Sequence, residues 1–180
     1  ATSAGYTFNP VEVKADDEKP AMNVEYHSKQ DIVDYYNKHP FDGDMDTKYK
    51  EEPDVFAPYN LGSLTQKTID NAQNMVNVVR YVAGLSGMTV EDASLSKSAQ
   101  AAALANAANG ELSHYPRRPR DMSDNMYNLA QEGASSSNIA MTSGRMTLPM
   151  SIRMYLSDAD SGNRSRVGHR RWILYPTLYK

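Results

Sequence analysis

The sequence contains no cysteine, which excludes disulfide bonds, thiolate catalysis and metal sites ligated by cysteine. No apolar run approaches the roughly 18 residues that a membrane-spanning helix needs. The net charge of −3 argues against a protein that binds nucleic acid through bulk positive charge. What remains is a chain of 180 residues, 40% of them hydrophobic, which is long enough for one domain with a single core.

The charge is unevenly distributed along the chain. Residues 1–109 carry 9 Lys and Arg against 16 Asp and Glu, whereas residues 110–180 carry 10 against 6. This asymmetry favours a surface of solvated ion pairs in the C-terminal third, with an Arg-rich rim that faces anionic groups as the alternative. The rim comprises Arg117, Arg118, Arg120, Arg164, Arg166, Arg170 and Arg171.

Residues 1–60 predict an extended acidic arm with one short helix. They carry 6 basic and 13 acidic residues and little apolar periodicity, so we expect them to lie across the domain without a core of their own. Tyr6–Val13 is a candidate edge strand. Ser28 followed by Asp31 is typical of a helix N-cap, and the helix that it opens must end before Pro40.

The alternating residues Asp42, Asp44 and Asp46 resemble the start of a calcium-binding EF-hand loop. Such a loop needs Gly at its sixth position and Glu at its twelfth, where this sequence has Thr47 and Pro53. The pattern therefore favours a solvated acidic turn over a calcium site.

Residues 61–180 predict one domain with four helices. Ser63 and Gln66 form a capping-box pair, and apolar residues then recur at helical spacing up to Gly84. The alanine-rich second helix ends at Gly110, and we expect Gly133 to end the third. The predicted helices span residues 63–83, 94–109 or 96–109, 123–132 and 147–156.

Two strands are predicted in the same region. Trp172–Tyr175 is aromatic and apolar and precedes Pro176, which favours a short buried strand, and Asn138–Met141 is the second candidate. A two-stranded sheet with open edges is marginal in water. We therefore expect a separate fragment or another copy of the chain to complete the sheet.

Several motifs occur in an order that resembles a known family. They are Asn77–Leu85 in a helix, Leu112-Ser113-His114, Ser137-Asn138-Ile139, and Gly168–Leu174 followed by Pro176. From about Pro58 to Tyr179 the chain resembles the CAP superfamily of cysteine-rich secretory, antigen 5 and pathogenesis-related proteins, in a bacterial cysteine-free form. The resemblance implies an α+β fold, namely an α-β-α sandwich around a small antiparallel sheet, and a secreted or cell-surface location. It also implies further strands after Pro176, so we expect the domain to lack its C-terminal strands and a separate C-terminal fragment to supply them.

The resemblance also implies a cleft in which His114 faces His169. Where the family has Gly-Glu-Asn, this chain has Ser136-Ser137-Asn138, so Ser137 replaces the family carboxylate. Glu111 or Asp158 is then the candidate third ligand for a zinc ion held by both histidines, with adventitious binding favoured over a catalytic metal.

Two functional classes follow from these residues. The first is a non-catalytic extracellular module that binds a protein, a cell-wall polymer or a lipid through the cleft and the Arg-rich rim. The cleft residues are His114, Ser137, Asn138, His169 and Arg170. The alternative is a metal-dependent or Ser/His hydrolase with Ser137 as nucleophile, either histidine as base and Asp158 or Asp160 as orienting acid. No Gly-x-Ser-x-Gly motif supports the hydrolase, and a purely structural role for both histidines is the third reading.

Overall fold

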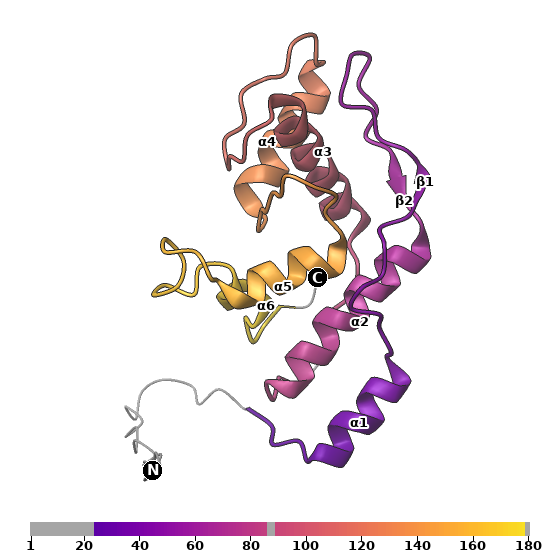
Figure 1. The fold of residues 1–180 in the computed structure, drawn as a ribbon, viewed down its shortest axis with the longest axis vertical. Coiled ribbons are helices and arrows are strands. Elements are labelled where there is room, and N and C mark those ends of the chain that lie inside the picture. Colours follow the sequence, from indigo (N-terminus) through magenta and orange to yellow (C-terminus); the bar gives the residue numbers. More distant parts are fainter. Residues whose placement is uncertain (1–23, 86–88, 179–180) are drawn as a thin grey trace, which may run out of the picture.

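The computed structural model of the chain describes residues 24–85 and 89–178. Over these ranges the fold is of the α+β class, with six helices and one small antiparallel sheet (Figure 1). The elements are α1 (Lys29–Lys38), β1 (Tyr49–Glu51), β2 (Ser63–Leu64), α2 (Gln66–Val82), α3 (Ala93–Asn109), α4 (Asp124–Ser136), α5 (Leu148–Ser157) and α6 (Arg170–Ile173). None of the described helices is long and apolar enough to span a membrane.

Local capping residues fix several helix ends where the sequence predicted them. Ser28 and Asp31 form the reciprocal capping box that opens α1. Gly110 ends α3 in the left-handed conformation, with φ 64°, which glycine adopts without steric cost. Thr147, at the predicted start of the fourth helix, caps α5 by accepting from the N–H of Met150. These predictions are confirmed because each depends on residues within one turn of the helix end.

Two predicted helix ends were wrong. Ser63 belongs to β2, and the side chain of Thr65 caps α2 instead by accepting from the N–H of Thr68. Helix α4 continues through Gly133 to Ser136. A Cβ on Gly133 would lie 2.0 Å from the carbonyl oxygen of Ser98 in α3, so this glycine permits close helix packing and does not stop the helix.

The sheet is a hairpin that the sequence did not predict. Strands β1 and β2 pair antiparallel, with Tyr49 opposite Leu64 and Glu51 opposite Ser63. These strands are too short for an alternating pattern to stand out, and the segment between them contains Pro53 and Pro58. The pairing crosses residue 60, the predicted boundary between arm and domain; that division stays a prediction. The candidate strand Tyr6–Val13 lies outside the described residues.

The two predicted strands of the C-terminal half were also wrong. Trp172–Tyr175 contributes to helix α6 and the turn after it, and the side chain of Trp172 is exposed. Asn138–Met141 carries no regular secondary structure. The β-prone pattern of Trp172–Tyr175 gave a wrong prediction because hydrogen bonds from Asp158, which is distant in sequence, organise the first turn of α6.

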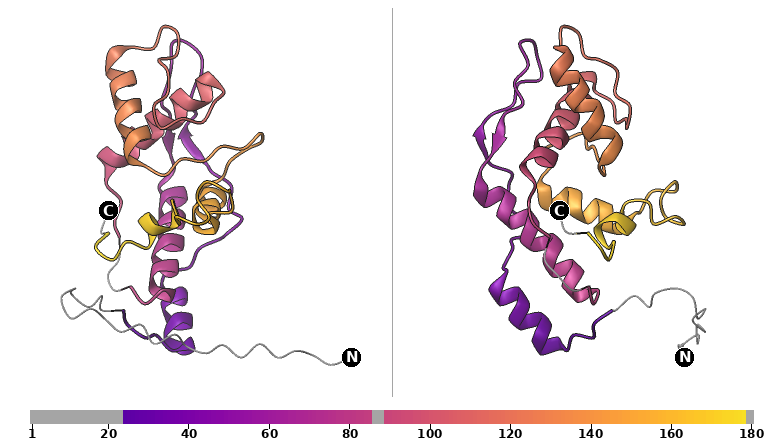
Figure 2. Two further views of the ribbon diagram at one scale, coloured as in Figure 1. Left: turned by 90° about the vertical axis from the view of Figure 1, so that its left-hand side faces the viewer. Right: turned by 180° about the vertical axis from the view of Figure 1, so that it is seen from behind.

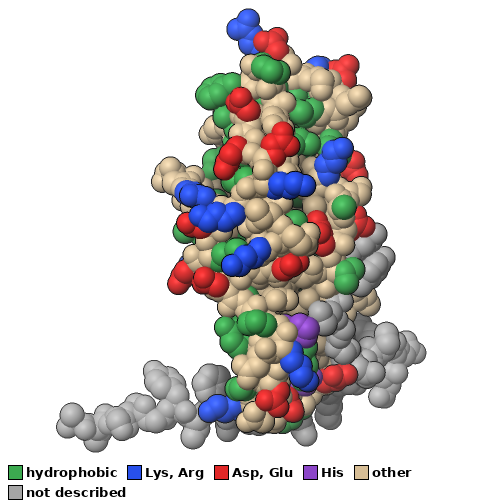
Figure 3. All heavy atoms as spheres, turned by 90° about the vertical axis from the view of Figure 1, so that its right-hand side faces the viewer, with side chains coloured by type: hydrophobic (Ala, Val, Ile, Leu, Met, Phe, Trp, Pro, Cys, Tyr) green, Lys and Arg blue, Asp and Glu red, His purple; other side chains and the backbone are tan. Residues whose placement is uncertain are grey.

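The helices form two packed groups along an elongated molecule. Helices α3 and α4 pack together at one end, α1 packs on α2 at the other, and α5 and α6 lie beside α2 (Figures 1 and 2). The core between α3 and α4 is closed and apolar, with Ala101, Leu104, Ala105, Met122 and Ala130 at most 3% exposed. Figure 3 shows acidic and basic side chains interspersed on one face, so that face carries no large patch of a single sign.

Arg80 of α2 holds the C-terminal segment in place. Its guanidinium is fully buried and donates to the carbonyl oxygens of Ile173 (2.6 Å), Tyr175 (2.9 Å) and Leu178 (3.1 Å). Burial without a carboxylate partner lowers the pKa of Arg80 from its ordinary value. One side chain therefore fixes the segment that follows His169 against α2.

Candidate functional site

The centre of the candidate site is a hydrogen-bonded pair formed by Asp158 and His169. Asp158 ends α5 in the left-handed conformation, with φ 44°, and its side chain is fully buried. Oδ1 accepts from the Nδ1–H of His169 (2.8 Å) and from its backbone N–H (3.0 Å). Oδ2 accepts from the backbone N–H of Arg170 (2.9 Å). The carboxylate thus fixes both the ring and the backbone at the start of α6.

These hydrogen bonds keep Asp158 ionised. Burial raises the pKa of this carboxyl, but the backbone N–H groups of Arg170 and His169 and the imidazole of His169 outweigh burial and lower it below its ordinary value. Because an ionised carboxylate only accepts, Nδ1 of His169 carries a proton and Nε2 of the neutral ring carries the lone pair. The pair therefore has the form of an oriented base.

Tyr155 and Asn138 connect this pair to the neighbouring elements. The rings of Tyr155 and His169 lie 5.5 Å apart, and Asn138 Nδ2 donates to the backbone carbonyl of His169 (3.2 Å). The Tyr155 hydroxyl donates to the carbonyl of Asn138 (3.1 Å), and burial raises the pKa of Tyr155 to about 12. Tyr155 is consequently a neutral donor that ties the linker after α4 to the His169 ring.

Asp160 completes a group with possible metal ligands. Asp158, Asp160 and His169 each place one ligand atom within 4.8 Å of the others, the one such group of three in residues 24–85 and 89–178. Asp160 Oδ1 already accepts from the N–H groups of Gly162 and Asn163, and Asp158 accepts three hydrogen bonds. Zinc would have to displace these donors, so the arrangement does not fit a zinc site without rearrangement.

His114 lies in a different environment from His169. It follows α3, its residue surface is exposed, and its Nδ1–H donates to the carbonyl of Ala134 (2.6 Å). No hydrogen bond, ion pair or ring contact joins it to His169. Glu111, the other candidate ligand, pairs with Arg117 at 3.0 Å on the surface. The structure therefore brings Asp158 to His169 but does not bring His114 into that group.

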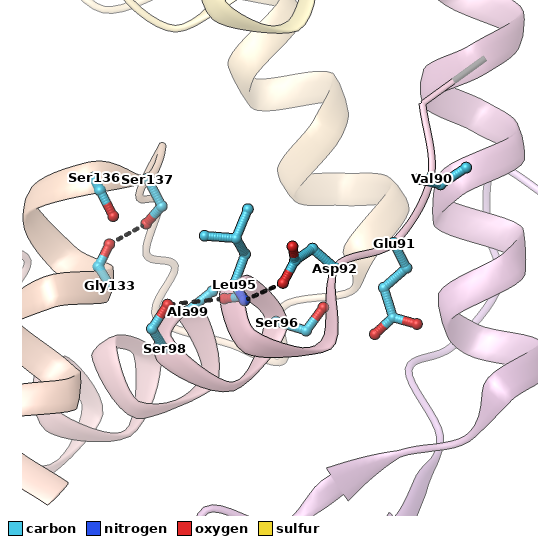
Figure 4. A pocket seen from close by; sticks show the side chains of 10 residues that line it. All are labelled: Val90, Glu91, Asp92, Leu95, Ser96, Ser98, Ala99, Gly133, Ser136 and Ser137. Atoms are coloured by element: carbon cyan, nitrogen blue, oxygen red, sulfur yellow. Dashed lines mark hydrogen bonds between the residues drawn. The ribbon is translucent and has the colours of Figure 1, made fainter. Parts of the chain in front are cut away.

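Ser137 forms no hydrogen bond with His114 or His169. Its hydroxyl donates to the carbonyl of Gly133 (2.7 Å) at the end of α4, as Figure 4 shows. This hydroxyl lines a small pocket between the start of α3 and the end of α4. A hydroxyl bonded to its own helix, with no hydrogen bond to an imidazole, has no activating base.

The predicted Arg-rich rim divides between two segments with local partners. Between α3 and α4, Arg118 pairs with Asp124 (2.6 Å) and Arg120 with Asp121 (3.6 Å). Between α5 and the end of α6, Arg164, Arg166 and Arg170 donate to backbone carbonyls, and Arg171 lies over the Trp172 ring at 5.0 Å. Arg164, Arg166 and Arg171 are exposed, whereas Arg170 is half-buried and its Nε has no hydrogen-bond partner among the described residues.

The acidic residues Asp42, Asp44 and Asp46 lie in the turn after α1. Asp42 Oδ1 accepts from the N–H of Asp44 (2.9 Å), and Asp46 pairs with Lys48 at 3.5 Å. They form no group of metal ligands among the described residues.

A groove of about 1010 Å³ lies next to the Asp158–His169 pair and was not predicted from the sequence. Ile69, Ala72 and Val76 of α2 form one wall, and Asn138–Thr142 and α5 form another. Alanines of α3 line it between these walls. Tyr155 and Asn138 line the groove and contact His169, so they connect the two features. The apolar stripe of α2 was visible in the sequence, but its exposure to an open space was not.

Comparison of the chain with protein-family models, curated protein sequences and solved structures gives no match.

Proposed function

We propose that this chain is a non-catalytic binding module that holds a partner in the groove between α2, α3 and α5. The groove, about 1010 Å³ in volume and lined mainly by apolar residues, is the observation that carries the proposal. Ligand sites are typically concave and apolar with a few polar groups that fix orientation. Here those polar groups include Gln100 and Asn138.

The proposal includes the family and the location that the motifs imply. We propose a CAP-like α-β-α sandwich that is secreted or held at the cell surface and binds a protein, a cell-wall polymer or a lipid. The groove replaces the two-histidine cleft as the binding surface, because His114 makes no contact with His169. Asp158 and His169 then have a positioning role, since they hold α6 and Tyr155 at the edge of the groove.

A hydrolase is the second candidate, favoured by the oriented Asp158–His169 pair. It ranks below binding because no described residue forms a hydrogen bond with Nε2 of His169, and Ser137 bonds to Gly133. The pair has an orienting acid and a base but no described nucleophile within hydrogen-bond reach.

Titration with the apolar fluorophore anilinonaphthalene sulfonate tests the binding proposal. Ala103→Trp places a large side chain in the groove and should weaken binding about tenfold or more. Lys97→Trp, on an exposed position of α3 outside the groove, is the matched control and should bind normally. Equal binding of the fluorophore by the wild type and both variants would contradict the proposal.

Ester hydrolysis separates the two candidate functions. We expect the wild type and His169→Ala to hydrolyse p-nitrophenyl butyrate at the same background rate. A rate that disappears in His169→Ala, while circular dichroism shows the fold to be intact, would establish the hydrolase instead.

A further inference from the structure

The segment Ile139–Thr142 has backbone groups without hydrogen-bond partners among the described residues. It joins α4 to α5, lines the groove and carries no helix, strand or turn. None of its four N–H groups or four carbonyl oxygens forms a hydrogen bond with any residue in 24–85 or 89–178. Ile139 and Ala140 are nevertheless half-buried. Backbone polar groups at such a place need water or another chain as partner.

The groove surface opposite this segment is formed by small apolar side chains. Ala99, Ala103 and Ala107 recur every four residues along α3, are exposed and line the groove. Their methyl groups leave room for larger side chains from an incoming molecule. Ile69 and Val76 of α2 extend the same apolar surface.

Three charged residues line the groove, namely Glu52, Glu91 and Arg145, and Arg145 donates to the carbonyl of Thr47. Glu52 and Glu91 line the groove, are exposed and form no ion pair among the described residues. Figure 4 shows Glu91 just before α3, with its carboxylate directed away from the serines of the small pocket. A lysine or arginine on the ligand would complement these two carboxylates.

We propose that the groove binds an extended polypeptide segment of another protein, which adds as a strand to Ile139–Thr142. Its backbone pairs with the free N–H and carbonyl groups, its alternate apolar side chains contact the α3 alanines, and a flanking basic residue lies near Glu91. This inference rests on the proposed function and names its partner class. A lipid tail would fill the apolar space but would satisfy none of the backbone groups.

Panning of a peptide library on the full chain tests the inference. The library holds nine-residue peptides with Val, Ile, Leu or Phe at alternate positions and Lys or Arg at both ends. An enriched peptide is labelled with fluorescein and titrated by anisotropy. We expect Ala103→Trp to weaken its binding about tenfold or more, Glu91→Gln to weaken it severalfold, and Lys97→Trp to leave it unchanged.

Two readouts report strand pairing itself. N-methylation of alternate peptide residues removes the N–H groups of one edge and should weaken binding about tenfold or more. Bound peptide should also slow hydrogen exchange at the amides of residues 139–142 by about tenfold or more. Equal affinity of the methylated peptide, or no added protection, would overturn the inference.

The remaining outcomes separate this inference from the proposed function. Suppose that palmitate displaces the fluorophore and that panning on the wild type enriches no peptide beyond panning on the Ala103→Trp protein. The module then binds lipid, so the strand inference fails while the proposed function stands. If native mass spectrometry shows a dimer that Ala103→Trp dissociates, a second copy is the occupant and the inference also fails. If neither fluorophore nor peptide binds, both proposals fail.

Discussion

Helix α3 has two faces made of the same residue type that differ completely in burial. Ala101 and Ala105 face α4 and are fully buried, whereas Ala99, Ala103 and Ala107 face the groove and are exposed. Gly133 lets the backbone of α4 approach the first face, while no described element covers the second. Alanine thus permits either close packing or an open surface, and the neighbouring elements decide which occurs.

The largest effect is expected from Ala105→Trp on the packed face. The site is fully buried in the α3–α4 core, so the indole must separate the helices. We expect a loss of at least about 3 kcal/mol in the free energy of unfolding, measured by urea denaturation. A loss below about 1 kcal/mol would mean that the two faces of α3 are packed alike.

Gly133→Ala tests the same contact from the side of α4. The added Cβ would lie 2.0 Å from the carbonyl oxygen of Ser98, which belongs to the backbone and cannot move aside alone. We expect a loss of about 3 kcal/mol. Gly144→Ala is the control, because a Cβ there meets nothing within 4 Å, and urea denaturation of the two variants should therefore differ clearly.

Asp158→Ala tests whether the Asp158 carboxylate holds α6 in place beside the groove. The N–H groups of His169 and Arg170 and the His169 ring lose their buried acceptor, so we expect a loss of about 2 kcal/mol at neutral pH. Hydrogen exchange should rise first in residues 158–173. If exchange in this segment is unchanged, Asp158 does not organise α6.

The pH dependence of stability follows from the same carboxylate. The folded pKa of Asp158 lies below its ordinary value of 3.8, so its contribution to stability is present above about pH 4 and is lost as the pH falls through the folded pKa. As the pH falls below about 4, the free energy of unfolding of the wild type should decrease more than that of Asp158→Ala. Parallel denaturation curves over that range would contradict this expectation.

His114→Ala is expected to have a small effect. The residue is exposed and contributes one hydrogen bond, to the carbonyl of Ala134, so we expect a loss of about 1 kcal/mol or less. Thermal denaturation of this variant and of His169→Ala compares the contributions of the two histidines to stability. A large loss in His114→Ala alone would mean that His114 organises more than this one contact.

The smallest effect is expected from Ala103→Trp on the open face of α3. The exposed indole meets free space, so we expect stability within about 0.5 kcal/mol of the wild type. This variant therefore serves as the folded, groove-filled protein in the binding experiments. Destabilisation comparable to that of Ala105→Trp would show that the groove is closed in solution.

The sequence alone determined the local features of the fold. Ser28, Thr147 and Gly110 marked helix ends correctly, and the sequence offered no apolar run long enough for a membrane-spanning helix. Capping is decided by hydrogen bonds within a few residues, so it can be read from a short stretch. The sequence also made His169 a candidate site residue, and Asp158, which the structure pairs with it, was one of several acids considered.

The tertiary structure alone decided what depends on residues distant in sequence. The run after His169 became a helix because Asp158, eleven residues earlier, binds its first N–H groups and Arg80 of α2 holds its end. Gly133 became a packing contact because Ser98 lies opposite. Burial and pairing are properties of two surfaces together, so a periodic or β-prone pattern on one of them does not determine the outcome.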